Sequence, residues 1–447
     1  MPHETLPCPS FAPGDAGYEA ARRAASWNAR LPDRFPDLIV HASDAQDAAA
    51  AVRLAIARGW RIGVRSGGHS WPANHLRDGG MLLDLSRLKA MEIDEAAMTA
   101  RVGPGVTGDQ VNAALAQRRL FFPVGHCKGV GLGGYLLQGG FGWNSRALGM
   151  ACENVLGIDY IGADGLARHA SATENSDIFW AARGAGPGFF GVVTRYHLKL
   201  HRRPRVIGAK VVSYGVDQFE TLCRWAHRIG PDVPASIELM LILSRHTPGV
   251  EGPGVTVIAP VFADSFRQAW RDLGFMKTLP NGARRKMPFL PIPLSKLTAA
   301  SMTHYPSDHN FAVDNMWTGA DIEALAPGLR RIAETLPPAP AHMLWMNWRP
   351  PASRPDMAYS LEDQVYIALY GAWQGKDESH PAAGWAQEHM AGMSHLSTGI
   401  QLADENLGRR PAPFLAAANM ARLDALRARH DPDGRFHPYM GRIGQAA

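Results

Sequence analysis

The sequence predicts an α+β protein built in two parts, and three observations support this fold class. Glycine is concentrated between residues 59 and 191, where short strands and helices alternate with glycine-rich turns. Beyond residue 206 the composition shifts to tryptophan, methionine and proline, and strands alternate with amphipathic helices. The segment HRRPRV at residues 201–206 lies at this change, so we expect the chain to cross between two domains there.

The elements of the first part follow from local signals. Residues 44–60 have an acidic start, alanine-rich apolar spacing and a final Gly59, which together predict a helix. Thr107 is expected to cap a second helix over residues 107–120. Strands, most of them ending in turns, are predicted at residues 61–66, 79–88, 98–106, 153–165 and 188–200. The first part is therefore a mixed domain of short elements.

The second part has longer elements. Amphipathic patterns predict helices at residues 264–273 and 321–336. Apolar runs predict strands at residues 234–244, 254–262 and 364–373. This alternation favours an antiparallel sheet with helices on one face.

Composition and charge exclude several classes of function. The chain has 447 residues, of which 46% are hydrophobic, and no stretch is apolar enough for a membrane helix. The formal net charge of +5 is spread along the chain, which argues against a nucleic-acid partner. No secretory signal is visible, and four cysteines are too few for a disulfide scaffold, so we expect a cytoplasmic protein without a membrane partner. The histidines show no HExxH or similar spacing, so no metal site is expected.

Three glycine-rich stretches indicate where a large ligand binds. The first, VRSGGHSWP at residues 64–72, places His69 on a tight turn after Arg65, although a polar surface turn is the alternative. The second, residues 125–142, contains the spacing GxGxxG, but further glycines leave no room for the helix that a dinucleotide fingerprint requires. The third is RGAGPGFFGVVT at residues 183–194. We expect the loops to converge on one ligand, with backbone N–H groups meeting its pyrophosphate.

Four motifs taken together resemble one family. They are RSGGHS at residues 65–70, CKGVGLGGYLLQGGFG at 127–142, RGAGPGFFGVVT at 183–194 and NMARLDALRARHDPDGRF at 419–436. Their order resembles that of the berberine-bridge-enzyme-like branch of the vanillyl-alcohol-oxidase flavoprotein superfamily. The resemblance implies a two-part FAD-binding domain of the PCMH type at residues 1–203 and 410–447. An α/β substrate domain, an antiparallel sheet covered by helices, would be inserted at residues 204–409.

The resemblance also implies how FAD is held. In this family the histidine of the GGH turn, here His69, bonds through a ring nitrogen to the 8α-methyl carbon of the flavin. A neutral imidazole is a competent nucleophile for this carbon. Cys127 matches the cysteine that bonds through sulfur to flavin carbon 6 in doubly attached members; the alternative is a buried free thiol. The other expected cofactor-binding residues are Arg65, Ser66, Gly67, Gly68, Ser70, Val130, Gly131, Gly133, Gly134, Gly139, Gly140, Gly142, Gly191, Val192 and Asn419.

The catalytic base is where the sequence departs from the family pattern. Family members often read Tyr-x-x-Asn-Tyr-x-Arg-Leu, with the first tyrosine acting as or supporting the base, but here Ala416 and Met420 stand at the tyrosine positions. The inserted domain must then supply the base. Strand alternation places Tyr366 and Tyr370 on one face of residues 364–373, a strand that faces the flavin in the family. A tyrosine accepts a proton only if its pKa is lowered, and the rivals are Glu362, Asp363 and His309.

The residues and the resemblance together predict a flavoenzyme. It would oxidise an alcohol or amine carbon of a small molecule by hydride transfer to FAD, with O2 as the acceptor and H2O2 as a product. In relatives the position of Val130 tends to hold valine in oxidases and isoleucine or leucine in dehydrogenases, because a larger side chain fills the path of oxygen. The alternatives are a flavin dehydrogenase with another acceptor and a non-catalytic flavin-binding protein.

Overall fold

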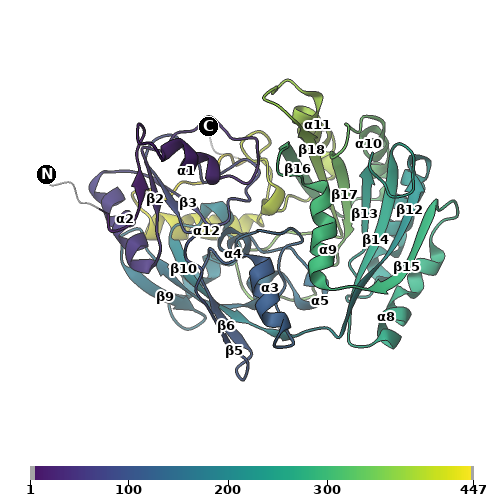
Figure 1. Cartoon of the computed structure of the whole chain (residues 1–447), viewed down its shortest axis with the longest axis horizontal. Helices are drawn as coiled ribbons and strands as arrows, with labels where there is room; N and C mark the ends of the chain where they lie inside the picture. Colours follow the sequence, from purple (N-terminus) through teal and green to yellow (C-terminus); the bar gives the residue numbers. More distant parts are fainter. Residues whose placement is uncertain (1–5, 444–447) are drawn as a thin grey trace.

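The computed structural model describes residues 6–443, which form two lobes side by side (Figure 1). The N-terminal lobe contains the strands β1 to β11, and the sheet lobe contains the strands β12 to β18. The predicted α+β class, with an antiparallel sheet in the second part, is confirmed. Within residues 6–443, no helix has both the length and the apolar character needed to cross a membrane.

The first sheet of the N-terminal lobe has the order β1-β2-β4-β3, with β2, β4 and β3 parallel. Helix α2 begins at the acidic start expected from the sequence, where the Asp44 carboxylate caps it by accepting bonds of 2.8 Å from the backbone N–H groups of Gln46 and Asp47. Strand β3 ends at Arg65, so the GGH turn leaves the carboxyl end of this sheet. The elements are β1 (Ser10–Phe11), α1 (Tyr18–Ala24), β2 (Leu38–His41), α2 (Ala45–Ala57), β3 (Ile62–Arg65) and β4 (Met81–Asp84).

A five-stranded antiparallel sheet of order β5-β6-β10-β8-β9 forms the rest of the lobe's core. Helix α3 starts after Thr107, whose backbone N–H is bound by the Gln110 side chain at 3.0 Å in a capping box. The strands are β5 (Met91–Asp94), β6 (Thr99–Val102), β8 (Val155–Ile161), β9 (Ala167–Ser171) and β10 (Val192–Lys199), with the short pair β7 (Leu120–Phe121) and β11 (His201–Arg202). The helices are α3 (Gly108–Ala116), α4 (Leu132–Leu137), α5 (Ser145–Leu148) and α6 (Ser176–Ala181).

The sheet lobe is built on seven antiparallel strands in the order β15-β12-β14-β13-β17-β18-β16. The strands are β12 (Val206–Gly215), β13 (Met240–Ser244), β14 (Gly254–Ala263), β15 (Arg285–Pro291), β16 (Asn310–Thr318), β17 (His342–Asn347) and β18 (Val365–Trp373). The helices are α7 (Phe219–Ile229), α8 (Phe266–Asp272), α9 (Leu294–Ser301), α10 (Ile322–Glu334) and α11 (Pro381–Gly392).

The two faces of this sheet have different neighbours. Val365, Ile367 and Leu369 of β18 share a core with α7, α10 and α11. Tyr366 and Tyr370 point to the opposite face and belong to the core of the N-terminal lobe. The prediction that these tyrosines share one face of the strand is therefore confirmed, and that face lies against the lobe that carries the glycine loops.

The chain returns to the N-terminal lobe at its end. Helix α12 (Ala417–His430), yellow in Figure 1, lies among the purple and blue elements of that lobe. Just after it, the backbone of Ile62 donates to the Arg435 carbonyl at 2.7 Å and accepts from the N–H of His437 at 3.1 Å. The C-terminal segment thus extends the edge of β3. The predicted boundaries after residues 203 and 409 stay a prediction.

Replacing Phe436 by alanine tests this return. Phe436 is 2% exposed, so Phe436→Ala should lower the free energy of unfolding by about 3–5 kcal/mol through lost burial and a cavity. Urea unfolding followed by circular dichroism measures the loss. Leu166→Ala, at a position 56% exposed, is the control and should change stability by less than about 0.5 kcal/mol. Equal midpoints for both variants would contradict the buried contact.

Candidate active site

A cavity of about 1140 Å³, counted out to its open mouth, lies where the three glycine-rich loops meet. Phe436 and His437 from the C-terminal return and Leu402, Ala403 and Glu405 complete its wall. A concave site walled by several loops suits a cofactor or a comparably large ligand. The predicted cofactor-binding residues in the wall are Arg65, Ser66, Gly67, Gly68, His69, Ser70, Val130, Gly131, Gly133, Gly134 and Gly191.

The loops meet backbone to backbone, and glycine makes this possible. A Cβ atom at Gly67 would lie 2.4 Å from the backbone nitrogen of Gly131, and one at Gly131 would lie 2.7 Å from the nitrogen of Gly67. Gly68 has a φ of +71°, and a Cβ there would lie 2.3 Å from the Ala25 carbonyl oxygen. Any side chain at these positions would separate the loops that form the wall.

His69 is held with its ring at the cavity wall. Trp27 stacks on it with ring centroids 5.2 Å apart, and the loop at Gly129 passes close to its Nε2 atom. Burial, with a smaller contribution from the charge of Arg65, lowers the pKa of His69 from 6.5 to about 4. Arg65 itself is tied to the Asp84 carboxylate at 2.6 Å. The His69 imidazole is therefore neutral at pH 7 and available as a nucleophile.

Cys127 lies on the same loop, two residues before Gly129, and is not part of the cavity wall. Burial and the negative charge of Asp404 raise the pKa of the Cys127 thiol from 9.0 to about 12. The thiol form therefore dominates at neutral pH. Asp404, described below, is therefore near enough for its charge to act on this thiol.

Five predicted cofactor-binding residues have packing roles outside the wall. A Cβ at Gly139, Gly140 or Gly142 would meet the Tyr359 ring, Ala151 or the Val124 carbonyl within 2.8 Å, so these glycines permit close contacts within the protein. Val192 is buried in β10 opposite Ile161. The Asn419 amide donates to the Met357 carbonyl at 2.9 Å. None of these five is among the described residues that line the cavity, although Tyr135 of the wall donates to the Gly140 carbonyl at 3.0 Å.

The cavity fits a large ligand with polar groups. His437 lines it, and its buried Nε2 atom has no hydrogen-bond partner among residues 6–443. A Cβ at Gly134 would have no described protein atom within 4 Å, so the wall leaves space beside this backbone. The neutral His69 ring and the unpartnered His437 nitrogen suit a long ligand that carries an electrophilic ring and hydrogen-bonding groups.

Asp404 is a carboxylate that the sequence did not single out. Its Oδ1 accepts from Trp71 Nε1 at 2.6 Å, and its Oδ2 accepts from the hydroxyls of Tyr366 at 2.5 Å and Tyr370 at 2.8 Å. Burial raises the pKa of Asp404 above its ordinary 3.8, although these three bonds oppose the rise. Its neighbours Leu402, Ala403 and Glu405 line the cavity, so the carboxylate lies beside it.

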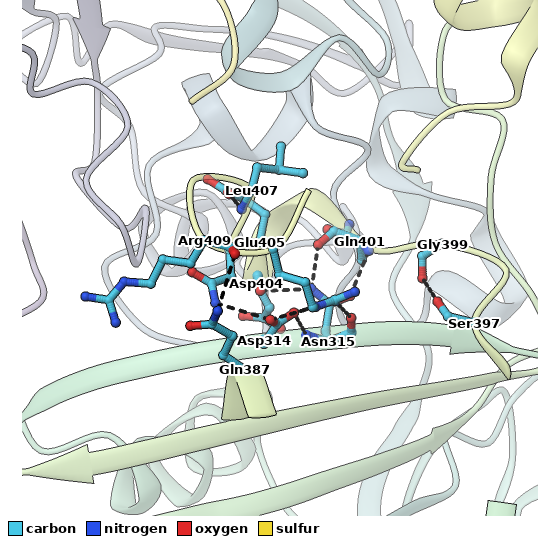
Figure 2. Close-up of polar contacts among 12 residues, drawn as sticks. Asp314, Asn315, Gln387, Ser397, Gly399, Gln401, Asp404, Glu405, Leu407 and Arg409 are labelled. Carbon is cyan, nitrogen blue, oxygen red and sulfur yellow. Dashed lines mark hydrogen bonds and ion pairs between the residues drawn. The ribbon is translucent and has the colours of Figure 1, made fainter. Parts of the chain in front are cut away.

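The segment that carries Asp404 is fixed to the edge strand β16 (Figure 2). The Asn315 amide donates to the backbone carbonyls of Gln401 at 3.0 Å and Asp404 at 2.8 Å, and its oxygen accepts from the Gln401 N–H at 2.8 Å. Next to it, the buried Asp314 forms an ion pair with Arg410. The only local signal in the sequence was an Asp-Glu pair shortly before the C-terminal motif, which has no spacing rule of its own.

Tyr366 and Tyr370 take a role different from the predicted one. Both pKa values lie well above 10, because both hydroxyls are buried and donate to Asp404. A base requires the opposite shift, so neither hydroxyl is a suitable proton acceptor by itself. Glu362 is bound to Arg354 and accepts from Tyr359 at 3.4 Å, away from the Asp404 cluster. In this structure Asp404 is thus the hydrogen-bond acceptor of the cluster, and Tyr366 and Tyr370 are donors to it.

Aromatic rings surround this cluster. Tyr370 stacks on His342 with centroids 4.5 Å apart and contacts Tyr305 at 5.3 Å and Trp71 at 5.8 Å. Burial, followed by the nearby His304, lowers the pKa of His342 well below 6.5. Asp404 is thus an acidic group surrounded by flat, largely apolar rings and a neutral imidazole.

The cavity with its glycine loops, beside a sheet that presents a buried carboxylate, defines a flavin-binding oxidoreductase. The family described as an FAD binding domain matches residues 36–171. FAD-linked oxidoreductase ptmO of Penicillium ochrochloron is 31% identical over 424 residues, which is 94% of this chain and 93% of the relative. The chain belongs to the FAD-linked oxidoreductases, and the resemblance found in the sequence is confirmed.

Solved structures agree on the fold. The 6-hydroxy-D-nicotine oxidase from Arthrobacter nicotinovorans matches with a TM-score of 0.84 at 24% identity over 99% of both chains. Wild-type Phl p 4.0202, described as a glucose dehydrogenase, matches with a TM-score of 0.80 at 19% identity over 97% of this chain and 96% of that chain. An isoleucine-to-valine variant of Phl p 4, described as a glucose oxidase, matches with a TM-score of 0.79 at the same identity.

Proposed function

We propose that this enzyme oxidises an alcohol or amine carbon of a small molecule by hydride transfer to FAD in the glycine-loop cavity, with O2 as the electron acceptor and H2O2 as a product. The observation that carries the proposal is Asp404, a carboxylate of raised pKa beside the cavity that accepts hydrogen bonds from Trp71, Tyr366 and Tyr370. Ionisable groups with shifted pKa values beside a cavity are typical of catalytic sites. The cytoplasmic location expected from the sequence belongs to the same proposal.

Bound FAD supplies the hydride acceptor, and the chain's own residues hold it. His69 is proposed as the point of covalent attachment, because its neutral ring lies in the wall and Gly67 lets the turn approach closely. Cys127 is proposed as the second point. Its pKa of about 12 makes the sulfur a slower nucleophile than the His69 nitrogen. The bond through Cys127 is therefore expected to form after the bond through His69.

Asp404 is proposed to take up the proton that the substrate loses. Removal of a hydride from a carbon that bears a hydroxyl or amino group leaves a proton on oxygen or nitrogen, which a nearby base must accept. Tyr366 and Tyr370 donate to Asp404. They orient the carboxylate and are suited to pass a proton to it. The surrounding rings of Trp71, Tyr305 and His342 favour a flat, largely apolar substrate.

Val130 is proposed to leave oxygen a path to the flavin. Val130 lines the cavity and directly follows Gly129, on the loop that passes close to His69. The matched pair of Phl p 4 structures, a dehydrogenase and an isoleucine-to-valine variant called an oxidase, supports control of the acceptor by one such side chain. A flavin dehydrogenase that uses another acceptor is the alternative that the third experiment below distinguishes.

Attachment through His69 and Cys127 is tested by acid precipitation. The wild-type protein should keep its yellow colour in the pellet, and His69→Ala should lose most of its flavin to the supernatant, because the link at the better nucleophile is gone. Cys127→Ala should keep the flavin bound through His69, and peptide mapping should find flavin on both residues of the wild type. Flavin that washes off denatured wild-type protein would refute attachment, and a free thiol at Cys127 in the native enzyme would refute the second bond alone.

The role of Asp404 is tested by Asp404→Asn. We expect kcat/KM to fall by about 10²–10⁴-fold, the usual contribution of a positioned base. A base works only when ionised, so the wild-type rate should fall as the pH drops through the raised pKa of Asp404, above the ordinary 3.8, and this acid limb should vanish in the variant. Glu362→Gln is the matched control and should retain the limb. An unchanged pH profile in Asp404→Asn would rule this base out.

The electron acceptor is tested by stopped-flow reoxidation. Wild-type enzyme reduced anaerobically by substrate should reoxidise rapidly in air and release H2O2. Val130→Leu adds one methylene to the cavity wall and should slow this step without changing the rate of flavin reduction. Val130→Ala, which opens the same space, is the control and should not slow it. Sluggish wild-type reoxidation would favour the dehydrogenase.

A further inference from the structure

A cluster of metal-ligating side chains lies on the five-stranded sheet, away from the cavity. The Asp159 Oδ1 atom is 2.8 Å from His169 Nδ1 and 3.0 Å from His197 Nε2. One donor atom from each of the three residues lies within 4.8 Å of the other two. The side chains are between 24% and 37% exposed, so the cluster is open to dissolved ions. None of the three lines the cavity.

The sheet register produces this cluster. Asp159 on β8 pairs with His169 on β9, and His197 on β10 pairs with Gly157, two residues along β8 from Asp159. Gly157 carries no side chain between the two rings, and a Cβ there would lie 3.0 Å from the His169 ring. The rings stand 5.1 Å apart and nearly perpendicular at 88°. The three residues are separated in the sequence and match no metal-binding spacing. The sequence therefore predicted no metal site, because only the pairing of the strands brings these side chains together.

The donor set is two imidazole nitrogens and one carboxylate oxygen. Zinc takes such ligands at about 2.0–2.1 Å in a tetrahedral arrangement, which places donor atoms roughly 3.3 Å apart. The two separations from the Asp159 oxygen, 2.8 and 3.0 Å, need a small outward adjustment to admit an ion, and the two imidazole donors lie within 4.8 Å of one another.

We propose that Asp159, His169 and His197 bind a divalent transition metal ion, with zinc as the type ion and water in the remaining position. Imidazole nitrogens select ions of this class over Mg²⁺ and Ca²⁺, which prefer sets of oxygen ligands. The bound ion links three neighbouring strands of the sheet. Its expected effect is therefore on the stability of the N-terminal lobe and not on the chemistry at Asp404.

A substitution at Arg195 provides a second test, in which metal binding is expected to become tighter and not weaker. The Arg195 Nε atom lies 3.9 Å from the Asp159 Oδ2 atom, so a positive charge stands beside the proposed ligand. A cation at this distance opposes the arrival of another cation. Removal of the charge in Arg195→Gln is therefore expected to tighten metal binding, whereas removal of any ligand weakens it.

Isothermal titration of the FAD-loaded full chain with Zn²⁺ tests the site. We expect one site, an affinity that drops by more than about tenfold in His169→Ala and in His197→Ala, and a tighter site in Arg195→Gln. Zinc should raise the midpoint of thermal unfolding of the wild type but not of the ligand variants. His395→Ala, at an exposed histidine elsewhere, is the matched control and should bind like the wild type.

The flavin absorbance of each variant shows that it is folded, so a failed fold is distinguished from a lost site. Equal zinc binding by the wild type and a His169→Ala/His197→Ala double variant would overturn the proposal. Binding of Mg²⁺ as tight as that of Zn²⁺ would overturn it as well, because the donor set would then not be selecting the ion.

Discussion

One buried carboxylate joins the two lobes at the point where the chemistry is proposed to occur. Asp404 accepts from Trp71, which belongs to the GGH loop of the N-terminal lobe, and from two tyrosines of β18 in the sheet lobe. The shared acceptor holds the GGH loop of the N-terminal lobe close to β18 of the sheet lobe. Asn315 and the Asp314–Arg410 pair hold the carboxylate's own backbone, so the arrangement does not depend on a mobile loop. The sheet face of β18 and the cavity wall are thus positioned relative to one another by a few hydrogen bonds.

The features that the sequence predicted are those that local geometry dictates. A turn in which Gly67 meets Gly131 backbone to backbone requires glycine, and this requirement is visible as a motif. The common face of Tyr366 and Tyr370 follows from strand alternation alone. The cap at Asp44 likewise depends on residues two and three positions away.

The features that the sequence missed depend on distant contacts. Trp71 and Asp404 are 333 residues apart, and only the complete fold brings them within 2.6 Å. Burial and the charge of Asp404 raise the pKa values of both tyrosines, and neither cause is visible in the local sequence. Gly139, Gly140 and Gly142 show the converse: a glycine-rich motif predicts close approach but not whether the neighbour is a ligand or the Tyr359 ring. None of these three glycines is among the described residues that line the cavity, so the lining gives no evidence for their predicted contact with FAD.

The C-terminal return has a consequence for the order of events during synthesis. Phe436 and His437 complete the cavity wall and pair with Ile62, which the ribosome produces more than 370 residues earlier. The nascent chain therefore emerges with the GGH turn exposed and its ligand cavity open on one side. The sheet lobe, continuous in sequence between β12 and β18, has all of its strands before α12 is made. The cavity wall is consequently completed only after residue 437 has been made, and a chain that terminates before residue 436 contains every strand of the sheet lobe but lacks part of the wall of the cavity.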